Sequence, residues 1–271
     1  MCSKCWIAPV VAVAMIGLVA CGGGGGSEEA AATPEASSTP APATESAAEP
    51  AAPATQAAGE MGSASVRGTI RFEGDVPNLR PLRMDADPGC AKKHDTDVMP
   101  EVLVLGENNA LANVFVRVTE GISGSYSSSE PVVLDQEGCR YTPHVVGVLT
   151  GQPFKILNSD GLLHNVHGLP EKNSAFNRAM PAAVTEADYV FDSEEIFKIK
   201  CDVHPWMGAW VGVSSHPFFD VSTTDGTFEI ASLPAGDYTI EAWHERLGAQ
   251  TATISVAEGD SVESNFVFTV N

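Results

Sequence analysis

The sequence predicts an all-β protein, and three of its features support this prediction. Apolar runs and alternating stretches of strand length recur from residue 65 to the end of the chain. Clusters of Gly, Asn and Asp separate these stretches, as turn residues separate strands. No stretch of this region sustains the apolar spacing of a helix. Many short strands at this spacing favour β-sandwiches.

Each expected strand follows from its own pattern. Residues 66–72 alternate apolar and polar side chains, as a half-buried strand does. Asp225-Gly226 predicts a tight turn between two strands of a hairpin over 219–230. Further apolar or alternating runs predict strands at 102–105, 112–118, 131–134, 145–148, 151–158, 197–201, 210–213, 238–243, 251–256 and 264–270.

Residues 1–20 resemble the signal peptide of a bacterial lipoprotein. Their apolar stretch is too short to span a bilayer comfortably and ends in Leu18-Val19-Ala20-Cys21. This ending is similar to a lipobox, so we expect cleavage before Cys21 and lipidation of its thiol. An ordinary secretory signal is the alternative interpretation. Gly22 follows the cysteine, which favours the outer membrane in a cell that has one.

Composition divides the rest of the chain. Residues 21–64 consist mainly of Ala, Pro, Glu, Gly, Ser and Thr, so we expect a disordered tether there. The whole chain has a net charge of −20, and the part after the tether holds 29 acids and 14 bases. Such a surface repels nucleic acid and favours a cationic partner, although it equally suits solubility in a salty habitat.

Two short runs carry the chemistry: LHNVH at 163–167 and CDVHPWM at 201–207. Two imidazoles, a thiolate and a thioether form the donor set of a blue-copper electron-transfer site, whereas structural zinc rarely uses a thioether. Alternation along the strand that ends at Cys201 turns its thiol toward the core. In the first run alternation shows only that His164 and His167 cannot both point inward.

The cysteines agree with an exported protein. After cleavage and lipidation three remain, at positions 90, 139 and 201. Two of the three can pair in an oxidising compartment, and copper ligation accounts for the third. We therefore expect a Cys90–Cys139 disulfide, which closes a span worth about 4 kcal/mol in the chain-entropy model. Two free, buried thiols are the alternative.

The residues over about 153–213 resemble the cupredoxins, most closely the amicyanin pattern with its His-Asn-Val-His run and Cys-x-x-His-x-x-Met loop. The resemblance implies a Greek-key β-sandwich with one type 1 copper ion. It selects His164 from the first run and gives the ligand set His164, Cys201, His204 and Met207. It also gives Asn165 a supporting role, in which its backbone N–H bonds the cysteine sulfur and its side chain ties the two ligand loops together.

The C-terminal part changes character. The run DGTFEIASLPAGDYTIEAWHE resembles the transthyretin-like or carboxypeptidase-regulatory β-sandwich module. We therefore divide the chain into residues 1–20, 21–64, a copper domain with an N-terminal β extension at 65–216, and a module at 217–271. About 55 residues are few for a full sandwich, so the module is free to share strands with residues 65–120.

The remaining histidines lack a complete ligand set, and we expect each to be polar surface or a satisfied hydrogen-bonding group; they are His94, His144, His167, His216 and His244. Pro205 and Trp206 flank His204, and we expect them to surround an exposed imidazole edge as an apolar docking patch. Packing of Trp206 within its loop is the alternative.

Together these features predict a lipid-anchored, monomeric electron carrier in the bacterial cell envelope, and not an enzyme. Its expected partners are redox proteins with a cationic or apolar docking patch and the membrane, with no nucleic acid. Two alternatives remain: a surface-anchored binding or scaffold lipoprotein that works through its C-terminal module, and a copper-handling protein. The seven methionines do not cluster, which disfavours copper delivery.

Overall fold

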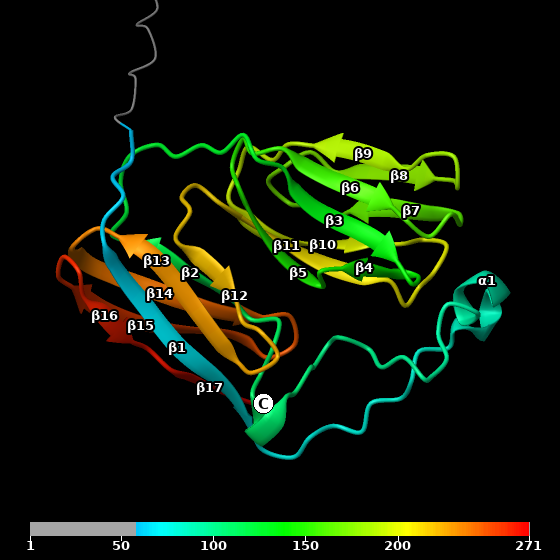
Figure 1. Cartoon of the computed structure of the whole chain (residues 1–271), viewed down its shortest axis with the longest axis horizontal. Helices are drawn as coiled ribbons and strands as arrows, with labels where there is room; N and C mark the ends of the chain where they lie inside the picture. The colour runs from blue at the N-terminus through cyan, green and yellow to red at the C-terminus, as the bar shows by residue number, and fades with distance from the viewer. Residues whose placement is uncertain (1–57, 271) are drawn as a thin grey trace, which may run out of the picture. The chain divides into compact units, whose positions relative to one another are not determined.

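The computed structural model describes residues 58–270, and nearly all their regular elements are strands (Figure 1). The predicted fold class is confirmed: the chain is all-β, with a cupredoxin-like β-sandwich and a further β module. Its strands form four sheets that enclose two hydrophobic cores. We call these the ligand sandwich, residues 132–214, and the module sandwich, residues 64–73, 115–120 and 219–269.

The ligand sandwich packs a five-stranded sheet on a four-stranded one. The first sheet has the order β5-β11-β10-β7-β8, formed by β5 (Val145–Leu149), β11 (Gly208–Ser214), β10 (Glu195–Lys200), β7 (His164–Gly168) and β8 (Phe176–Met180). The second has the order β4-β3-β6-β9, formed by β4 (Arg140–Thr142), β3 (Val132–Glu137), β6 (Phe154–Asn158) and β9 (Glu186–Tyr189). Alternate residues of β6 and β10 are buried, so one face of each strand supplies the core.

The module sandwich draws its strands from both ends of the described chain. One sheet places β1 (Ala64–Glu73) beside β13 (Thr227–Leu233), β16 (Ser261–Glu263) and β17 (Phe266–Thr269). The other has the order β12-β2-β14-β15, formed by β12 (Phe219–Val221), β2 (Phe115–Glu120), β14 (Gly236–His244) and β15 (Gly248–Val256). β1 is central because it pairs antiparallel with β13 and parallel with both β16 and β17.

This pairing changes the picture of the domains. From the sequence we expect residues 65–216 to form one copper domain with an N-terminal β extension, but β1 and β2 lie in the sheets of the C-terminal strands. The 55 residues after position 216 are too few to bury a core alone, so they share strands from upstream, the possibility that their length left open. The ligand sandwich is therefore an insertion between β2 and β12 of the module sandwich.

Two strand predictions also differ from the structure. Residues 102–105 form no strand: they are an irregular segment from which Leu103 and Leu105 pack on the module core, and Leu105 makes an isolated bridge. The expected hairpin over 219–230 has its turn, with the Gly226 N–H bonded to the Thr223 carbonyl. Its two strands, however, pair with β2 and β1 in different sheets.

A long connection, residues 74–114, leaves β1, reaches the ligand sandwich and returns to β2 (Figure 1). It contains η1 (Met84–Ala86), α1 (Pro88–Ala91) and η2 (Glu107–Asn109). The Asp87 side chain caps α1 by accepting the Gly89 N–H at 2.7 Å, and proline at the first helical position fits this start. The predicted disulfide is present: it joins Cys90 of α1 to Cys139 in the turn between β3 and β4.

Residues 58–63 are ordered, although composition assigned them to the tether. The Gly59 N–H bonds the Ser125 carbonyl, the Gly62 N–H bonds the Ser232 carbonyl, and the Tyr126 hydroxyl donates to the Glu60 carbonyl. Backbone pairing overrides composition here because the segment lies against the strands of a formed sandwich. The predicted signal peptide, Cys21 and the rest of the tether lie outside the described residues.

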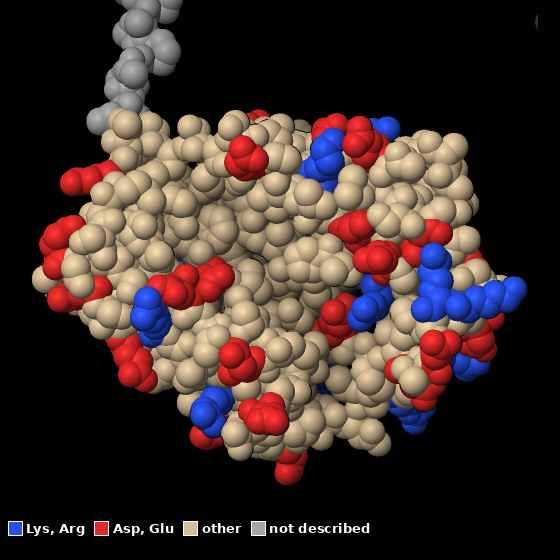
Figure 2. Space-filling view, in the orientation of Figure 1, with Lys and Arg blue, Asp and Glu red and all other residues tan. Residues whose placement is uncertain are grey.

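Charge is unevenly spread over the face in Figure 2. Acidic side chains are scattered across it, whereas basic side chains gather at the end where Figure 1 places α1. Within residues 58–270, no helix combines the length and hydrophobicity needed to cross a membrane.

We expect Gly68→Ala to destabilise the protein by about 2 kcal/mol or more, because a Cβ at this position would lie 1.8 Å from the Ser264 carbonyl oxygen. That oxygen belongs to backbone and cannot rotate away, so β1 and the C-terminal strands would have to separate. Urea unfolding measures the effect. Val267→Ala, on the exposed face of β17, is the control, and equal midpoints for the two variants would contradict the prediction.

Candidate metal centre

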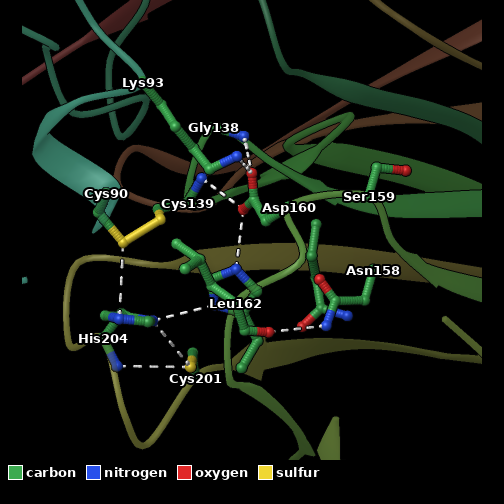
Figure 3. A network of polar contacts seen from close by, with 12 residues as sticks. Cys90, Lys93, Gly138, Cys139, Asn158, Ser159, Asp160, Leu162, Cys201 and His204 are labelled. Carbon is green, nitrogen blue, oxygen red and sulfur yellow. Dashed lines mark hydrogen bonds and ion pairs between the residues drawn. A yellow bond between two sulfur atoms is a disulfide. The ribbon is translucent and has the colours of Figure 1, made fainter. Parts of the chain in front are cut away.

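His164 opens β7 and is fully buried. The loop before it is fixed by Asn158 at the end of β6, whose side-chain amide donates to the carbonyls of Leu162 and Met180 at 3.0 Å each. Figure 3 shows the first of these contacts beside the site. Asn158 therefore joins the loop before His164 to β6 and β8, and Nδ1 of the imidazole faces His204.

Cys201 follows directly after β10, and the burial along that strand matches the alternation of the sequence. Phe197, Ile199 and Cys201 are each at most 2% exposed, whereas Lys198 points to solvent. The backbone N–H groups of Asn165 and His204 both approach the sulfur at 3.4 Å. These donors stabilise a negative sulfur.

The pKa of the Cys201 thiol reflects this environment. Burial raises it, but the hydrogen bond with His164 and the two backbone N–H groups outweigh burial and hold it below the usual value. A thiol with a lowered pKa is readily converted to the thiolate that binds metals.

The loop from Cys201 to Met207 is closed on itself. The Met207 N–H donates to the His204 carbonyl at 2.9 Å, and the Cys201 N–H donates to the Met207 carbonyl at 3.2 Å. His204 and Met207 are both 2% exposed. The closed loop thus fixes the separation of its three candidate ligands.

Three donor atoms converge at this point. Nδ1 of His164 lies 3.0 Å from Nδ1 of His204, and Sγ of Cys201 lies 3.8 Å from Nδ1 of His204. All three atoms lie within 4.8 Å of one another. Donors at metal-bond lengths of about 2.0–2.3 Å in a trigonal plane are about 3.5–3.8 Å apart, so the spacing suits a single ion.

Two other groups of side chains in residues 58–270 have a similar spacing: Asp87, Cys90 and His204, and Cys139, Asp160 and His164. Both use a sulfur of the disulfide, which is not a thiolate. Cys201 is the free cysteine of the described chain, so the group of His164, Cys201 and His204 alone combines imidazoles with an available thiol.

The outer nitrogens of both histidines also have partners. Nε2 of His164 lies 2.8 Å from Oδ2 of Asp160, a side chain that is 1% exposed. The Gly138 N–H donates to Oδ1 of this carboxylate and the Cys139 N–H to Oδ2, at 2.7 Å each. Lys93 completes the environment of this carboxylate at 3.0 Å (Figure 3). Because its Nε2 is bound to Asp160, His164 is left with Nδ1 as the nitrogen that faces the centre.

The edge of His204 is covered, contrary to our expectation of an exposed imidazole. Its Nε2 lies 3.1 Å from Oδ2 of Asp87 and 3.6 Å from Sγ of Cys90, and Figure 3 shows the disulfide lying over the ring. Trp206 packs 5.0 Å from the imidazole and donates to the Cys139 carbonyl at 3.1 Å. The connection 74–114 is the cause, because the disulfide anchors α1 on top of this histidine.

Asn165 makes the contacts expected of it. Besides its backbone approach to the sulfur, its side-chain Oδ1 accepts the Asp202 N–H at 2.6 Å and so joins the two ligand loops. Its amide bonds Asn177 of β8, and its carbonyl accepts the Tyr141 hydroxyl at 2.5 Å.

The other histidines lie away from the three donor atoms. His167 points to the outside of β7 and pairs with Asp202 at 2.9 Å, and His94 bonds the Gly138 carbonyl at 2.7 Å. His144, His216 and His244 are buried rather than on the surface. His144 bonds Glu245 through Nε2, whereas its Nδ1 has no hydrogen-bond partner among residues 58–270 and lies 3.9 Å from a carboxylate oxygen of Glu101.

Sequence reasoning missed two residues of the site, Asp87 and Asp160. Asp160 had a usable signal, since it lies four residues before His164 in the loop that delivers that ligand. Asp87 lies 117 residues before His204, and nothing in its own neighbourhood indicated the contact.

Comparison with known proteins gives a partial likeness. No family model and no curated protein matches the chain. Among solved structures, an oxidised proline-to-alanine mutant of amicyanin has 22% identity and a TM-score of 0.29, over 31% of this chain and 82% of that one. A purple cupredoxin from Nitrosopumilus maritimus has 21% identity and a TM-score of 0.27, over 30% of this chain and 98% of that one.

A copper-containing nitrite reductase from Thermus scotoductus SA-01 has 16% identity and a TM-score of 0.31, over 37% of this chain and 25% of that one. These structures are cupredoxins or copper proteins by their names, and each likeness covers well under half of this chain. The chemistry inferred below therefore depends on the residues of the centre itself.

Asp160 should make the unfolding free energy of the protein depend on pH in the acid range. Burial raises its pKa, but His164, Lys93 and the two backbone N–H groups outweigh burial and lower the pKa to about 2. A lowered pKa stabilises the fold above pH 3.8, and that contribution is lost as the pH falls through about 2. We expect the difference in unfolding free energy between the metal-free protein and Asp160→Asn to shrink by about 2 kcal/mol over this interval.

Urea unfolding at a series of pH values measures this difference. Asp95→Asn, which changes an exposed carboxyl of the same connection as Lys93, is the control. A difference between wild type and Asp160→Asn that stays constant from pH 5 to pH 2 would mean that the carboxylate is not held by these charges.

Proposed function

We propose that the protein is a copper electron carrier with one type 1 site, held by His164, Cys201, His204 and Met207. The convergence of two imidazole Nδ1 atoms and one free thiol at 3.0 and 3.8 Å is the observation that supports this most directly. Bound copper would supply a one-electron couple between Cu(I) and Cu(II).

The donor set favours copper over zinc. Structural zinc is usually bound by a closed set of cysteines and histidines, and a thioether suits copper in a His₂Cys plane with a weak axial methionine. Met207 is buried at the end of the closed loop, where its side chain packs in the same core cluster as Cys201. A buried thioether on the same loop as the free thiol suits the role of the weak axial ligand of a His₂Cys plane.

The protein's own residues keep the centre rigid and dry. Asp160 and Asp87 hold the outer nitrogens of the two histidines, and Asn165 joins the ligand loops. All four candidate ligands are at most 2% exposed, so they offer almost no surface to water. A site that rearranges little is suited to rapid exchange of single electrons.

We further propose that the carrier is not an enzyme and works as a monomer anchored by a lipid on Cys21 in a bacterial cell envelope. The lipobox-like run of the sequence supports the anchor, and the acidic body supports redox protein partners with cationic patches rather than nucleic acid. The tether would let the body move between partners.

The Cu(II)-loaded full-length protein should show an intense blue thiolate-to-copper band, which Cys201→Ala removes because the thiolate is the source of the colour. Visible absorption before and after reduction measures it. His167→Ala is the matched control, since this imidazole of the same run pairs with Asp202 on the outside. A colourless protein that retains no copper would sink the proposal.

Asn165→Ala should weaken copper binding by about tenfold, because loss of the side chain separates the loops that carry His164 and Cys201. Competition with a chelator of known affinity gives the ratio. Asn177→Ala removes a neighbour of this amide and a bond to the Asp202 carboxylate but keeps the Asn165–Asp202 tie, so it should have the smaller effect. Equal affinities for wild type and Asn165→Ala would show that the loops hold their positions without the tie.

A further inference from the structure

Because the edge of His204 is covered, electrons must enter the centre by another route. Asp87, the disulfide and Trp206 surround that ring, so a partner does not reach it directly. The centre does border a cavity on another side. This cavity has a volume of about 600 Å³, and Cys201, Trp206 and Met207 form part of its wall.

The size and position of the cavity suit a small molecule. Ligand sites commonly have volumes of about 300–1,000 Å³ with a few polar groups that fix the ligand. Here those polar groups include Arg140, Lys198 and Lys200 on the ligand sandwich, and Glu101 on the connection 74–114. A molecule in this cavity would lie next to two candidate copper ligands.

The carboxylates of the cavity wall are engaged by neighbours. Glu245 uses one oxygen for His144 and the other for the indole N–H of Trp210 at 2.8 Å. Asp202 is held by Lys200 at 2.8 Å and by His167 at 2.9 Å. Glu101 is looser, with 3.8 Å to Arg140 and 3.9 Å to His144.

Two cationic side chains of the wall have fewer bonding partners than these carboxylates. Nε of Arg140 is buried and has no hydrogen-bond partner among residues 58–270. Lys198 forms no ion pair within that range and lies with its Nζ 5.8 Å from the Trp210 ring. The Arg140 side chain lines this cavity, so an anion inside it would pair with the positive charge of the guanidinium.

We propose that this cavity binds a small anionic electron donor beside the metal centre. The proposal rests on the proposed function and names the chemical class of one of its partners. With Cu(II) bound by the four candidate ligands, the donor would lose one electron, Cu(II) would be reduced to Cu(I), and no bond would form or break. Arg140 and Lys198 favour the more negative, reduced donor, and the oxidised product, one negative charge poorer, is held less tightly and leaves.

Binding can be measured without copper. Calorimetry of the metal-free, full-length protein with hexacyanoferrate(II) at low ionic strength should show one saturable site, despite the net charge of −20 that repels anions elsewhere. Lys198→Glu and Arg140→Gln should each weaken binding by about tenfold. Lys92→Glu, which makes the same charge change as Lys198→Glu at the exposed end of α1, should leave binding within about twofold.

The same variants test the electron route in the copper-loaded protein. The rate at which hexacyanoferrate(II) bleaches the blue band should fall about tenfold in Lys198→Glu and stay nearly unchanged in Lys92→Glu. Circular dichroism confirms that the variants fold, and Arg140→Gln supplies a second test if one variant does not. A rate that responds to Lys92→Glu instead would place entry at α1 and overturn the proposal.

The two proposals fail in different ways. Absence of saturable anion binding, or binding that Lys198→Glu and Arg140→Gln leave intact, overturns the cavity proposal even when the blue band is present. Absence of the blue band with anion binding that both variants weaken removes the electron-carrier function, and the cavity then remains an anion site without a redox role.

Discussion

The candidate centre depends above all on one buried carboxylate, that of Asp160. Its two oxygens receive the imidazole of His164, the backbone N–H groups of Gly138 and Cys139, and the ammonium of Lys93. A buried charge is tolerated only when it is this well partnered, so each partner is fixed in turn. Through these contacts the carboxylate orients a ligand and locates the disulfide turn at the same time.

The disulfide connects Asp160 to the environment of the other histidine, His204. Cys139 is held by Asp160, and its bond to Cys90 places α1 and Asp87 against Nε2 of His204. Both candidate imidazole ligands are therefore supported from outside by carboxylates that belong to different parts of the fold. The result is an enclosed centre, with a cavity beside Cys201 and Met207 in place of an open histidine edge.

Local patterns predicted much of this arrangement. Alternation along β10 gave the inward thiol of Cys201, and the spacing of the second run gave a loop that returns His204 and Met207 to it. Elimination among three cysteines gave the Cys90–Cys139 bond. Each of these inferences used residues within one element or one chemical class, where sequence is most informative.

Contacts between distant segments could not be predicted in this way. Asp87 reaches His204 only because the connection 74–114 crosses to the ligand sandwich, and no periodicity encodes such a path. The same holds for β1 and β2, whose alternation identified them as strands without identifying their partners. Choosing His164 over His167 required a family resemblance, since alternation treats the two positions symmetrically.

The insertion of one sandwich into the other has a consequence for how the chain folds. Strands β3 to β11 are contiguous in sequence, so the ligand sandwich can assemble from nearby segments once residue 214 is available. The module sandwich cannot close until β16 and β17, almost the last residues of the chain, reach β1 near its beginning. Until then the edge of β1 opposite β13 is unpaired and exposed to other chains, and the interval between the two events is when the protein is most prone to aggregate.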